Sequence, residues 1–169
     1  MKVALIMGSD SDLPVIQPAL DTLQQFHVPY EVLVASAHRT PDVVHRFAAD
    51  AADRGVRVII AAAGAAAHLP GVVASFTTLP VIGVPINSTS VGGLDALLSI
   101  VQMPAGIPVA TMAINGAKNA ALFALQILAM GDENLDLRFK KYRADMAAEV
   151  ERKNANLQTQ LKQQTHSEN

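Results

Sequence analysis

The fold is decided by the stretch YEVLVASAHRTP (residues 30–41), which passes from a strand through a short loop into a helix. Residues 30–34 are apolar and β-branched enough to predict a buried strand. Thr40 and Pro41 then supply a helix N-cap and a proline at the first helical position. This unit predicts that His38 and Arg39 lie at the carboxyl end of a strand, where open α/β sheets bind their ligands.

His38 and Arg39 together offer two kinds of chemistry in one loop. Histidine is the side chain whose ordinary pKa lies nearest neutrality, so it suits proton transfer. Arginine carries a planar fork of donors that fits a phosphate or a carboxylate. A His-Arg pair before a helix can also be a solvated loop with no further role, and residues 36–41 alone leave both interpretations open.

The same alternation of strand and helix continues outward from residues 30–41 in both directions. Strands are predicted at 2–7, 56–61, 81–84 and 109–114. The first helix is expected to start at an Asp12 cap and end at Val28-Pro29, and others follow at 41–54, 72–77, 94–101, 117–130 and from 134. The pattern predicts a three-layer α/β fold of the flavodoxin-like kind, with a five-stranded parallel sheet in the order 2-1-3-4-5 and a C-terminal helical extension.

The length and composition of the chain predict one domain with subunit contacts. The chain has 169 residues, of which 50% are hydrophobic and 17% are charged. We expect a single domain over 1–150 and a polar, disordered tail over 151–169. The helix at 117–130 is apolar on nearly all sides, which favours burial in the core and in an interface.

Several classes of function are disfavoured by composition. The chain has no run long enough to predict a membrane span and no signal-peptide pattern, so we expect a cytoplasmic protein. A net charge of −2 gives no electrostatic case for nucleic-acid binding. The absence of Cys excludes disulfides and thiolate ligands. Metal binding is not predicted either, because no carboxylate has ligand spacing with His38 and His68.

A second loop, residues 8–12, leads from the first strand into a helix N-terminus that favours an anion. Ser9 and Ser11 can add hydroxyl donors, and Asp12 suits a ribose hydroxyl, whereas Asp10 is interpreted as part of a cap-rich turn. The sequence lacks both G-x-G-x-x-G and G-x-x-x-x-G-K-[ST]. It therefore favours a single phosphate over a dinucleotide or a triphosphate.

The loops at 62–71 and 87–93 are expected at the same edge of the sheet. Small residues over 62–67 let the backbone approach a ligand, although tight packing under a helix explains these alanines equally well. His68 is either a core histidine or a second polar group of the site. The remaining histidines lie on predicted helices or in the tail and are interpreted as incidental: His27, His45 and His166.

Four motifs occur in order along the chain: GSDSD (8–12), SAHRTP (36–41), AAHLPG (66–71) and SIVQMP (99–104). Over about residues 2–131 the chain resembles the class I N5-carboxyaminoimidazole ribonucleotide mutases of purine biosynthesis. The resemblance implies a carboxylate moved from N5 to C4 of an aminoimidazole ribonucleotide, no metal or organic cofactor, and a homo-octamer.

The resemblance also implies roles for individual residues. His38 would be the acid/base, Asp12 would hold the ribose, and Arg39 with the serines would hold the phosphate. His68 and the backbone of residues 64–67 would line the pocket for the migrating carboxylate. The substrate-binding set implied is Ser9, Ser11, Asp12, Ser36, Arg39, Gly64, Ala65, Ala66, His68 and Leu69.

The sequence differs from the usual pattern of this family at two places, and three other functions are alternatives to it. Related proteins usually carry glycine where this chain has Ala62 and Ala65, which could narrow the pocket, and the turn at 115–119 looks shorter than usual. The nearest rival is the class II relative, which carboxylates aminoimidazole ribonucleotide directly with CO₂. A flavin carrier would need stacking aromatics at the edge, and a phospho-receiver module would need an aspartate ending the third strand, where the chain has 61–64, AAAG.

Overall fold

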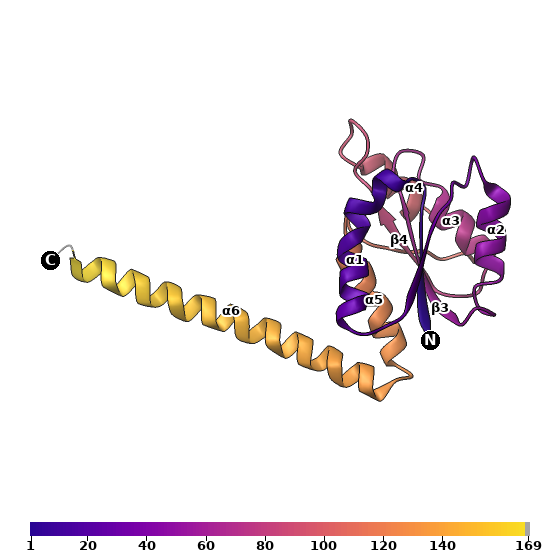
Figure 1. Ribbon diagram of the computed structural model, residues 1–169. Coiled ribbons are helices and arrows are strands. Elements are labelled where there is room, and N and C mark those ends of the chain that lie inside the picture. The colour runs from indigo at the N-terminus through magenta and orange to yellow at the C-terminus, as the bar shows by residue number, and fades with distance from the viewer. Residues whose placement is uncertain (168–169) are drawn as a thin grey trace.

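A five-stranded parallel sheet forms the centre of the computed structural model, which describes residues 1–167 and side chains as far as residue 164 (Figure 1). Its order is β2-β1-β3-β4-β5, which confirms the predicted order. The strands are β1 (Lys2–Met7), β2 (Tyr30–Val34), β3 (Val56–Ala63), β4 (Val81–Pro85) and β5 (Ala110–Thr111).

The strand register brings all carboxyl ends to one edge. Ile6 is paired with Leu33 on one side and with Ala61 on the other, and Ala61 is paired in turn with Gly83. Gly83 is needed for space, because a Cβ atom there would lie 2.4 Å from Ile100 on the helix that covers β4. Since every pair is parallel, the loops that follow β1 to β4 share the edge that the sequence predicted for ligand binding.

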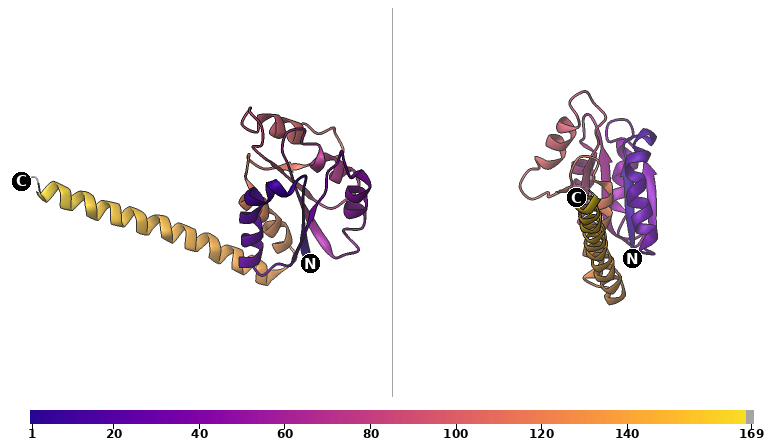
Figure 2. Two further views of the ribbon diagram at one scale, coloured as in Figure 1. Left: turned by 45° about the horizontal axis from the view of Figure 1, so that its top comes forward. Right: turned by 90° about the vertical axis from the view of Figure 1, so that its left-hand side faces the viewer.

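Two layers of helices cover the sheet, so the predicted three-layer fold is confirmed (Figures 1 and 2). One face packs against α1 (Leu13–Gln25) and α5 (Ala117–Ala129). The other face packs against α2 (Pro41–Ala49), α3 (Leu69–Ser75) and α4 (Leu94–Val101). Alternation along β1 divides the two cores, because Leu5 belongs to the first and Ile6 to the second.

The helix starts differ from the prediction in how they are capped. Neither Asp12 nor Thr40 makes a side-chain cap bond to the helix that follows it. The Thr40 hydroxyl instead accepts from the Ser36 backbone N–H and donates to the Ser36 carbonyl, which closes the loop between them. A short 3₁₀ helix, η1 (Asp10–Asp12), precedes α1 and has Ser9 as its N-cap. The predicted caps were wrong: the Thr40 hydroxyl closes its own loop, and Ser9 rather than Asp12 provides a cap, at the start of η1.

Several element boundaries also differ from the prediction. β5 has two residues where a strand at 109–114 was predicted, and α2 ends at Ala49 rather than near Arg54. β3 continues to Ala63, and α3 starts at Leu69 rather than at Val72. The longer β3 and earlier α3 shorten the loop between them, which draws small residues and Leu69 toward the ligand edge.

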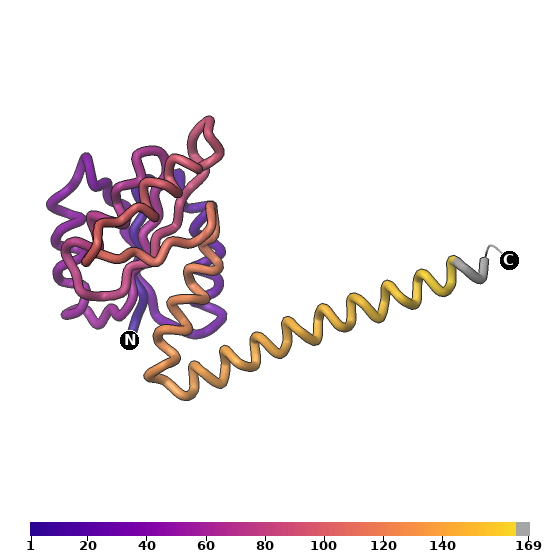
Figure 3. Tube along the Cα trace, turned by 180° about the vertical axis from the view of Figure 1, so that it is seen from behind, coloured from indigo at the N-terminus to yellow at the C-terminus, as the bar shows by residue number. Residues whose placement is uncertain are grey.

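Helix α6 (Glu133–Ser167) leaves the body of the molecule as a single rod (Figures 1 and 3). The Asp132 side chain accepts from the Leu135 backbone N–H and caps its start. Leu135 is buried, and the rings of Phe139 and Tyr142 pack on Phe26 at centroid distances of 5.8 and 5.4 Å. None of the helices in residues 1–167 has both the length and the apolar character needed to cross a bilayer.

The helix continues through much of the segment for which disorder was predicted. Residues 151–167 belong to α6, whereas residues 168–169 and the side chain of His166 lie outside the described part. Glycine and proline do not occur after Gly131, and the Glu149–Lys153 ion pair bridges one turn at 2.7 Å. The polar composition that predicted disorder is thus also compatible with a solvated helix.

Candidate active site

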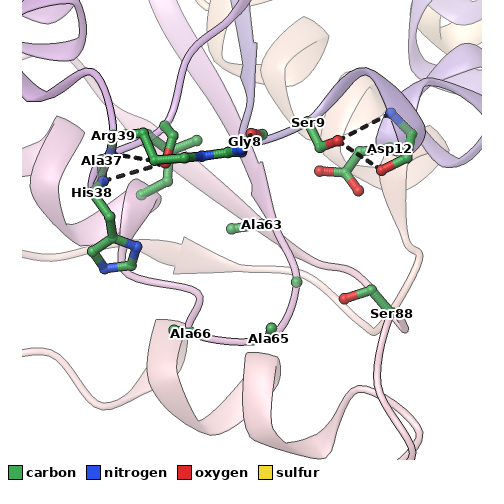
Figure 4. Close-up of a pocket in the computed structure, with 14 residues that line it drawn as sticks. Gly8, Ser9, Asp12, Ala37, His38, Arg39, Ala63, Ala65, Ala66 and Ser88 are labelled. Atoms are coloured by element: carbon green, nitrogen blue, oxygen red, sulfur yellow. Dashed lines mark hydrogen bonds between the residues drawn. The ribbon is translucent and has the colours of Figure 1, made fainter.

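Loops after β1, β2, β3 and β4 enclose a cavity at the carboxyl edge of the sheet (Figure 4). Its volume is about 410 Å³, which is within the usual range for small-molecule sites. Polar groups and small apolar residues share its wall. The lining residues are Gly8, Ser9, Ser11, Asp12, Ser36, Ala37, His38, Arg39, Ala63, Gly64, Ala65, Ala66, Leu69 and Ser88.

The first loop presents two serines and a buried carboxylate. The Ser11 hydroxyl donates to Ser9 Oγ at 2.8 Å, and the Ser11 backbone N–H donates to the same oxygen at 3.3 Å. Asp12 is only 7% exposed. Burial raises the pKa of Asp12, a backbone hydrogen bond with Ser9 opposes this, and the charge of Asp10 raises it further. A carboxylate with so little water gains from a ligand that brings hydroxyl donors.

The second loop is folded by its own serine. Ser36 Oγ accepts the backbone N–H groups of His38 at 3.3 Å and of Arg39 at 3.2 Å, which fixes both residues at the start of the turn. Arg39 Nη2 donates to the Gly8 carbonyl oxygen at 3.3 Å and so connects this loop to the first. The guanidinium therefore lies beside Gly8 at the cavity wall (Figure 4).

His38 is paired with His68 from the third loop. The His38 Nε2 and His68 Nδ1 atoms are 2.8 Å apart, and the two rings meet edge to face at 84°. A hydrogen bond between ring nitrogens needs one N–H donor and one bare nitrogen. The contact is therefore incompatible with a proton on both of these nitrogens, and the pair is suited to hold a single proton between them.

The third loop brings small side chains against the cavity. Ala65 has φ +44°, in the left-handed region, where a Cβ atom costs about 1–2 kcal/mol. Ala65 is one of the two alanines that the resemblance marked as departures, and its backbone accepts this strain. Ala62, the other position, is buried in the core on the α1 side of the sheet and does not line the cavity.

The structure brings the predicted site residues together. Ten of them line the cavity, and His68 contacts His38. His45 instead packs on Phe76 at the end of α3, and His27 lies two residues beyond the end of α1, with φ +53°. Gly8, Ala37, Ala63 and Ser88 also line the cavity, although none of them was predicted as a site residue. Gly8 and Ala37 belong to the motifs at 8–12 and 36–41, Ala63 lies in the small-residue stretch at 62–67, and Ser88 lies in the loop at 87–93 that was expected at this edge.

The arrangement of the cavity suits an anionic ribonucleotide. Arginine and serine donors, a carboxylate and His38, which contacts His68, face one space with small-residue walls. Within residues 1–167, three or more His, Asp or Glu side chains do not gather into a metal-ligand set. The chain can therefore supply anion binding, hydroxyl recognition and proton transfer from its own side chains.

Comparisons with known proteins show the family to which the chain belongs. A family model described as AIR carboxylase matches residues 2–149. The N5-carboxyaminoimidazole ribonucleotide mutase of Pyrococcus abyssi is 61% identical over 145 residues, which are 86% of this chain and 83% of that protein. The mutase of Thermotoga maritima is 54% identical over 149 residues, covering 88% and 87%. Treponema denticola PurE has a crystal structure that matches with a TM-score of 0.78 and 29% identity over 88% of this chain and 92% of that chain.

Proposed function

The chain belongs to the AIR carboxylase family and is an N5-carboxyaminoimidazole ribonucleotide mutase, and we propose that it acts through decarboxylation and recarboxylation with His38 as acid and base. The carboxylate moves from N5 to C4 and gives 4-carboxy-5-aminoimidazole ribonucleotide. The observation that carries the mechanism is the 2.8 Å contact between His38 Nε2 and His68 Nδ1 at the wall of the anion-binding cavity.

In this proposal the first two loops hold the ribose phosphate. Asp12 accepts hydrogen bonds from the ribose, and Arg39 with Ser9, Ser11 and Ser36 binds the phosphate. One of the five guanidinium N–H donors is used on Gly8, which leaves others for the ligand. Burial of Asp12 supports the ribose assignment, because a poorly solvated carboxylate is stabilised by hydroxyl donors.

His38 then carries one proton through the reaction. Loss of CO₂ breaks the bond between N5 and the carboxylate carbon, and His38 donates a proton to N5. The electron-rich C4 attacks the CO₂ and forms the new carbon–carbon bond. His38 next accepts the proton from C4, which restores the aromatic ring and returns the histidine to its first state. The protons balance, so the cycle needs no outside acid or base.

The third loop confines the CO₂ between the two steps. Ala63, Gly64, Ala65 and Ala66 line the cavity with little bulk, and Leu69 adds an apolar side chain. These groups offer CO₂ no strong partner and give water little to bind. Retention of CO₂ beside C4 replaces a bimolecular encounter by a reaction within one complex.

Substrate conversion tests the function directly. Purified protein should convert the N5-carboxylated ribonucleotide to the C4-carboxylated product without ATP or added bicarbonate. The control is aminoimidazole ribonucleotide with bicarbonate, which the class II carboxylases use. Rapid turnover of the control with none of the N-carboxylated substrate would contradict the mutase assignment.

We also propose that residues 1–150 form the working unit of a cytoplasmic homo-octamer. The support is the apolar surface of α6, where Leu137 and Met146 are 64% and 50% exposed. Native mass spectrometry at micromolar concentration should give the octamer mass, and a dominant monomer would contradict it. A chain that ends after Val150 should still assemble and turn over, because the removed segment carries little apolar surface.

A further inference from the structure

Ser88 is the cavity residue for which neither the motifs nor the proposed mechanism gives a role. It lies in the loop after β4, whereas the other lining residues come from the loops after β1, β2 and β3. Figure 4 shows its hydroxyl on the side of the cavity where Asp12 lies, across from His38. An inference about Ser88 rests on the proposed function, since it concerns the same substrate.

Gly64 has the conformation of an ordinary residue, and Ser88 explains why no side chain stands there. A Cβ atom on Gly64 would lie 1.9 Å from Ser88 Oγ, 2.9 Å from Ser88 Cβ and 3.3 Å from the Ile86 carbonyl oxygen. Its φ is outside the left-handed region, so glycine is required by space rather than by backbone geometry. The absence of a side chain at Gly64 therefore leaves the space that the Ser88 hydroxyl occupies.

The backbone around Ser88 is held at three points. The Ile86 N–H donates to the Ala63 carbonyl at 2.9 Å, and the Asn87 N–H donates to Asn115 Oδ1 at 2.9 Å. The Ser88 N–H donates to the Ile86 carbonyl at 3.0 Å. These bonds tie the loop to β3 and to the turn before α5, so the backbone that carries the Ser88 side chain is fixed at the cavity wall.

The Ser88 hydroxyl differs from the other cavity hydroxyls in having no protein partner. Ser9 and Ser11 bond to each other, and Ser36 Oγ accepts two backbone N–H groups. Among the side chains described, up to residue 164, none hydrogen-bonds to Ser88 Oγ, and no backbone group of residues 1–167 does. A hydroxyl can donate and accept at once, which matches a sugar hydroxyl better than a carboxylate can alone.

We propose that Ser88 is a substrate-binding residue whose hydroxyl hydrogen-bonds to the ribose of the nucleotide, from the wall opposite the phosphate-binding arginine. Asp12 accepts a hydrogen bond from the ribose in the same region, so both side chains bind the sugar. Because His38 lies across the cavity, Ser88 contributes to binding and to the choice of a ribonucleotide rather than to proton transfer.

Binding of 4-carboxy-5-aminoimidazole ribonucleotide, measured by calorimetry, tests this role. Ser88→Ala should raise the Kd about 3- to 10-fold, the scale of one neutral hydrogen bond, and should raise the KM by more than it lowers turnover at saturating substrate. Ser90→Ala, on the same loop and outside the cavity wall, is the matched control and should bind as the unaltered chain does. Unaltered affinity in Ser88→Ala would overturn the proposal.

Two further measurements assign the contact. The effect of Ser88→Ala should vanish for either the 2′-deoxy or the 3′-deoxy analogue of the product. An effect that persists with both analogues would overturn the ribose assignment. Gly64→Ala should weaken binding at least as much as Ser88→Ala does, because the added Cβ atom displaces the Ser88 hydroxyl. The double variant should then bind only slightly more weakly than Gly64→Ala alone. Additive losses of binding free energy would contradict the coupling between the two positions.

The two proposals can fail separately. If the unaltered chain does not convert the N-carboxylated substrate, the proposed function fails. If it converts the substrate and Ser88→Ala matches Ser90→Ala in affinity, only the role of Ser88 fails.

Discussion

The cavity edge and helix α6 differ in where their side chains find partners. At the edge, Ser9, Ser36 and His38 are each held by contacts within the chain. Along α6, Leu135 is buried, but two residues later Leu137 is 64% exposed, and Met146 and Val150 are exposed as well. The side chains at the edge are thus held within the chain, whereas α6, polar along most of its length, carries several apolar side chains that its own chain leaves exposed.

The difference implies that catalysis depends on the cavity edge and that association of chains depends on α6. Changes at the edge should affect binding and turnover in any oligomeric state, and changes on exposed α6 residues should affect association first. The sheet body lies between the two, because its core residues determine whether the edge is formed at all. The following predictions test that separation, from the largest expected effect to the smallest.

Loss of the acid/base at the edge should give the largest effect. His38→Asn keeps a similar shape but cannot give and retake a proton, so turnover at saturating substrate should fall about 10²- to 10⁴-fold. Oligomeric state and nucleotide binding should be retained, because α6 and the anion-binding residues are unchanged. Turnover is measured on protein whose fold is checked by circular dichroism.

Two other histidines serve as references for His38. His68→Asn should lose less activity, since it removes the partner of the ring rather than the ring itself. His45→Asn should stay near full turnover, because His45 packs on Phe76 and does not line the cavity. A folded His38→Asn that keeps more than about a tenth of the turnover would remove His38 as the proton carrier.

Leucine truncations compare the body with α6 directly. Leu125 on α5 is fully buried, so Leu125→Ala should lower the free energy of unfolding by about 2–5 kcal/mol. Leu137→Ala on α6 should change it by about 0.5 kcal/mol or less in the dissociated chain, while weakening the oligomer. Urea unfolding and native mass spectrometry at matched protein concentrations check both. Equal losses of unfolding free energy in Leu125→Ala and Leu137→Ala would refute the separation of the sheet body from α6.

Arg39→Lys tests the edge without altering its charge. Lysine cannot reproduce the planar fork of donors, so product affinity should fall by an amount equivalent to about 1–3 kcal/mol. Native mass spectrometry should show the same oligomer as for the unaltered chain, since Arg39 lies far along the sequence from α6. A product titration that gives unaltered affinity would remove Arg39 from the anion site.

The sequence predicted the edge well because strand ends and motifs coincide there. Each of the first three loops follows an apolar strand, so the parallel sheet brings Ser9, His38 and Gly64 together from topology alone. The loop at 87–93 was expected at this edge, but Ser88 was not singled out in it, because its place in the cavity wall depends on the bond from Asn87 to Asn115 and on the space left at Gly64, which are contacts between distant segments. The capping errors at Asp12 and Thr40 have a local origin instead, because Thr40 bonds to Ser36 within its own loop and Ser9 caps the 3₁₀ helix that precedes α1.

Helix α6 was predicted less well for a different reason. Its polar sequence past Val150 matches both a disordered tail and a solvated helix, because neither buries apolar surface. Turn-spanning pairs such as Asp136–Lys140 and Glu149–Lys153 support the helix. Composition does not distinguish the two states when the helix packs on nothing in its own chain, and this again separates α6 from the edge.

Ion pairs in the two regions give the smallest predicted effect. In the body, burial works to raise the pKa of Glu31, but hydrogen bonds and charges from Arg54 and Lys2 outweigh it and hold that pKa below its ordinary 4.5. On α6, a hydrogen bond from Lys153 lowers the pKa of Glu149. Both carboxylates are thus stabilised in the ionised form, but only Glu31 joins elements of the sheet body, β1 and the segment before β3.

Acid should therefore weaken the body through Glu31 and not through Glu149. A carboxylate whose pKa is lowered by folding adds stability above its unfolded value, and that stability is lost as the pH falls from about 4.5 through the lower folded pKa. For this partly exposed pair the loss should be about 1 kcal/mol or less. Urea midpoints of the body, measured between pH 6 and pH 3, should fall less steeply in Glu31→Gln than in the unaltered chain, whereas Glu149→Gln should follow the unaltered curve. A Glu149→Gln curve as flattened as that of Glu31→Gln would mean that α6 and the body unfold as one unit, and the separation drawn between them would not hold.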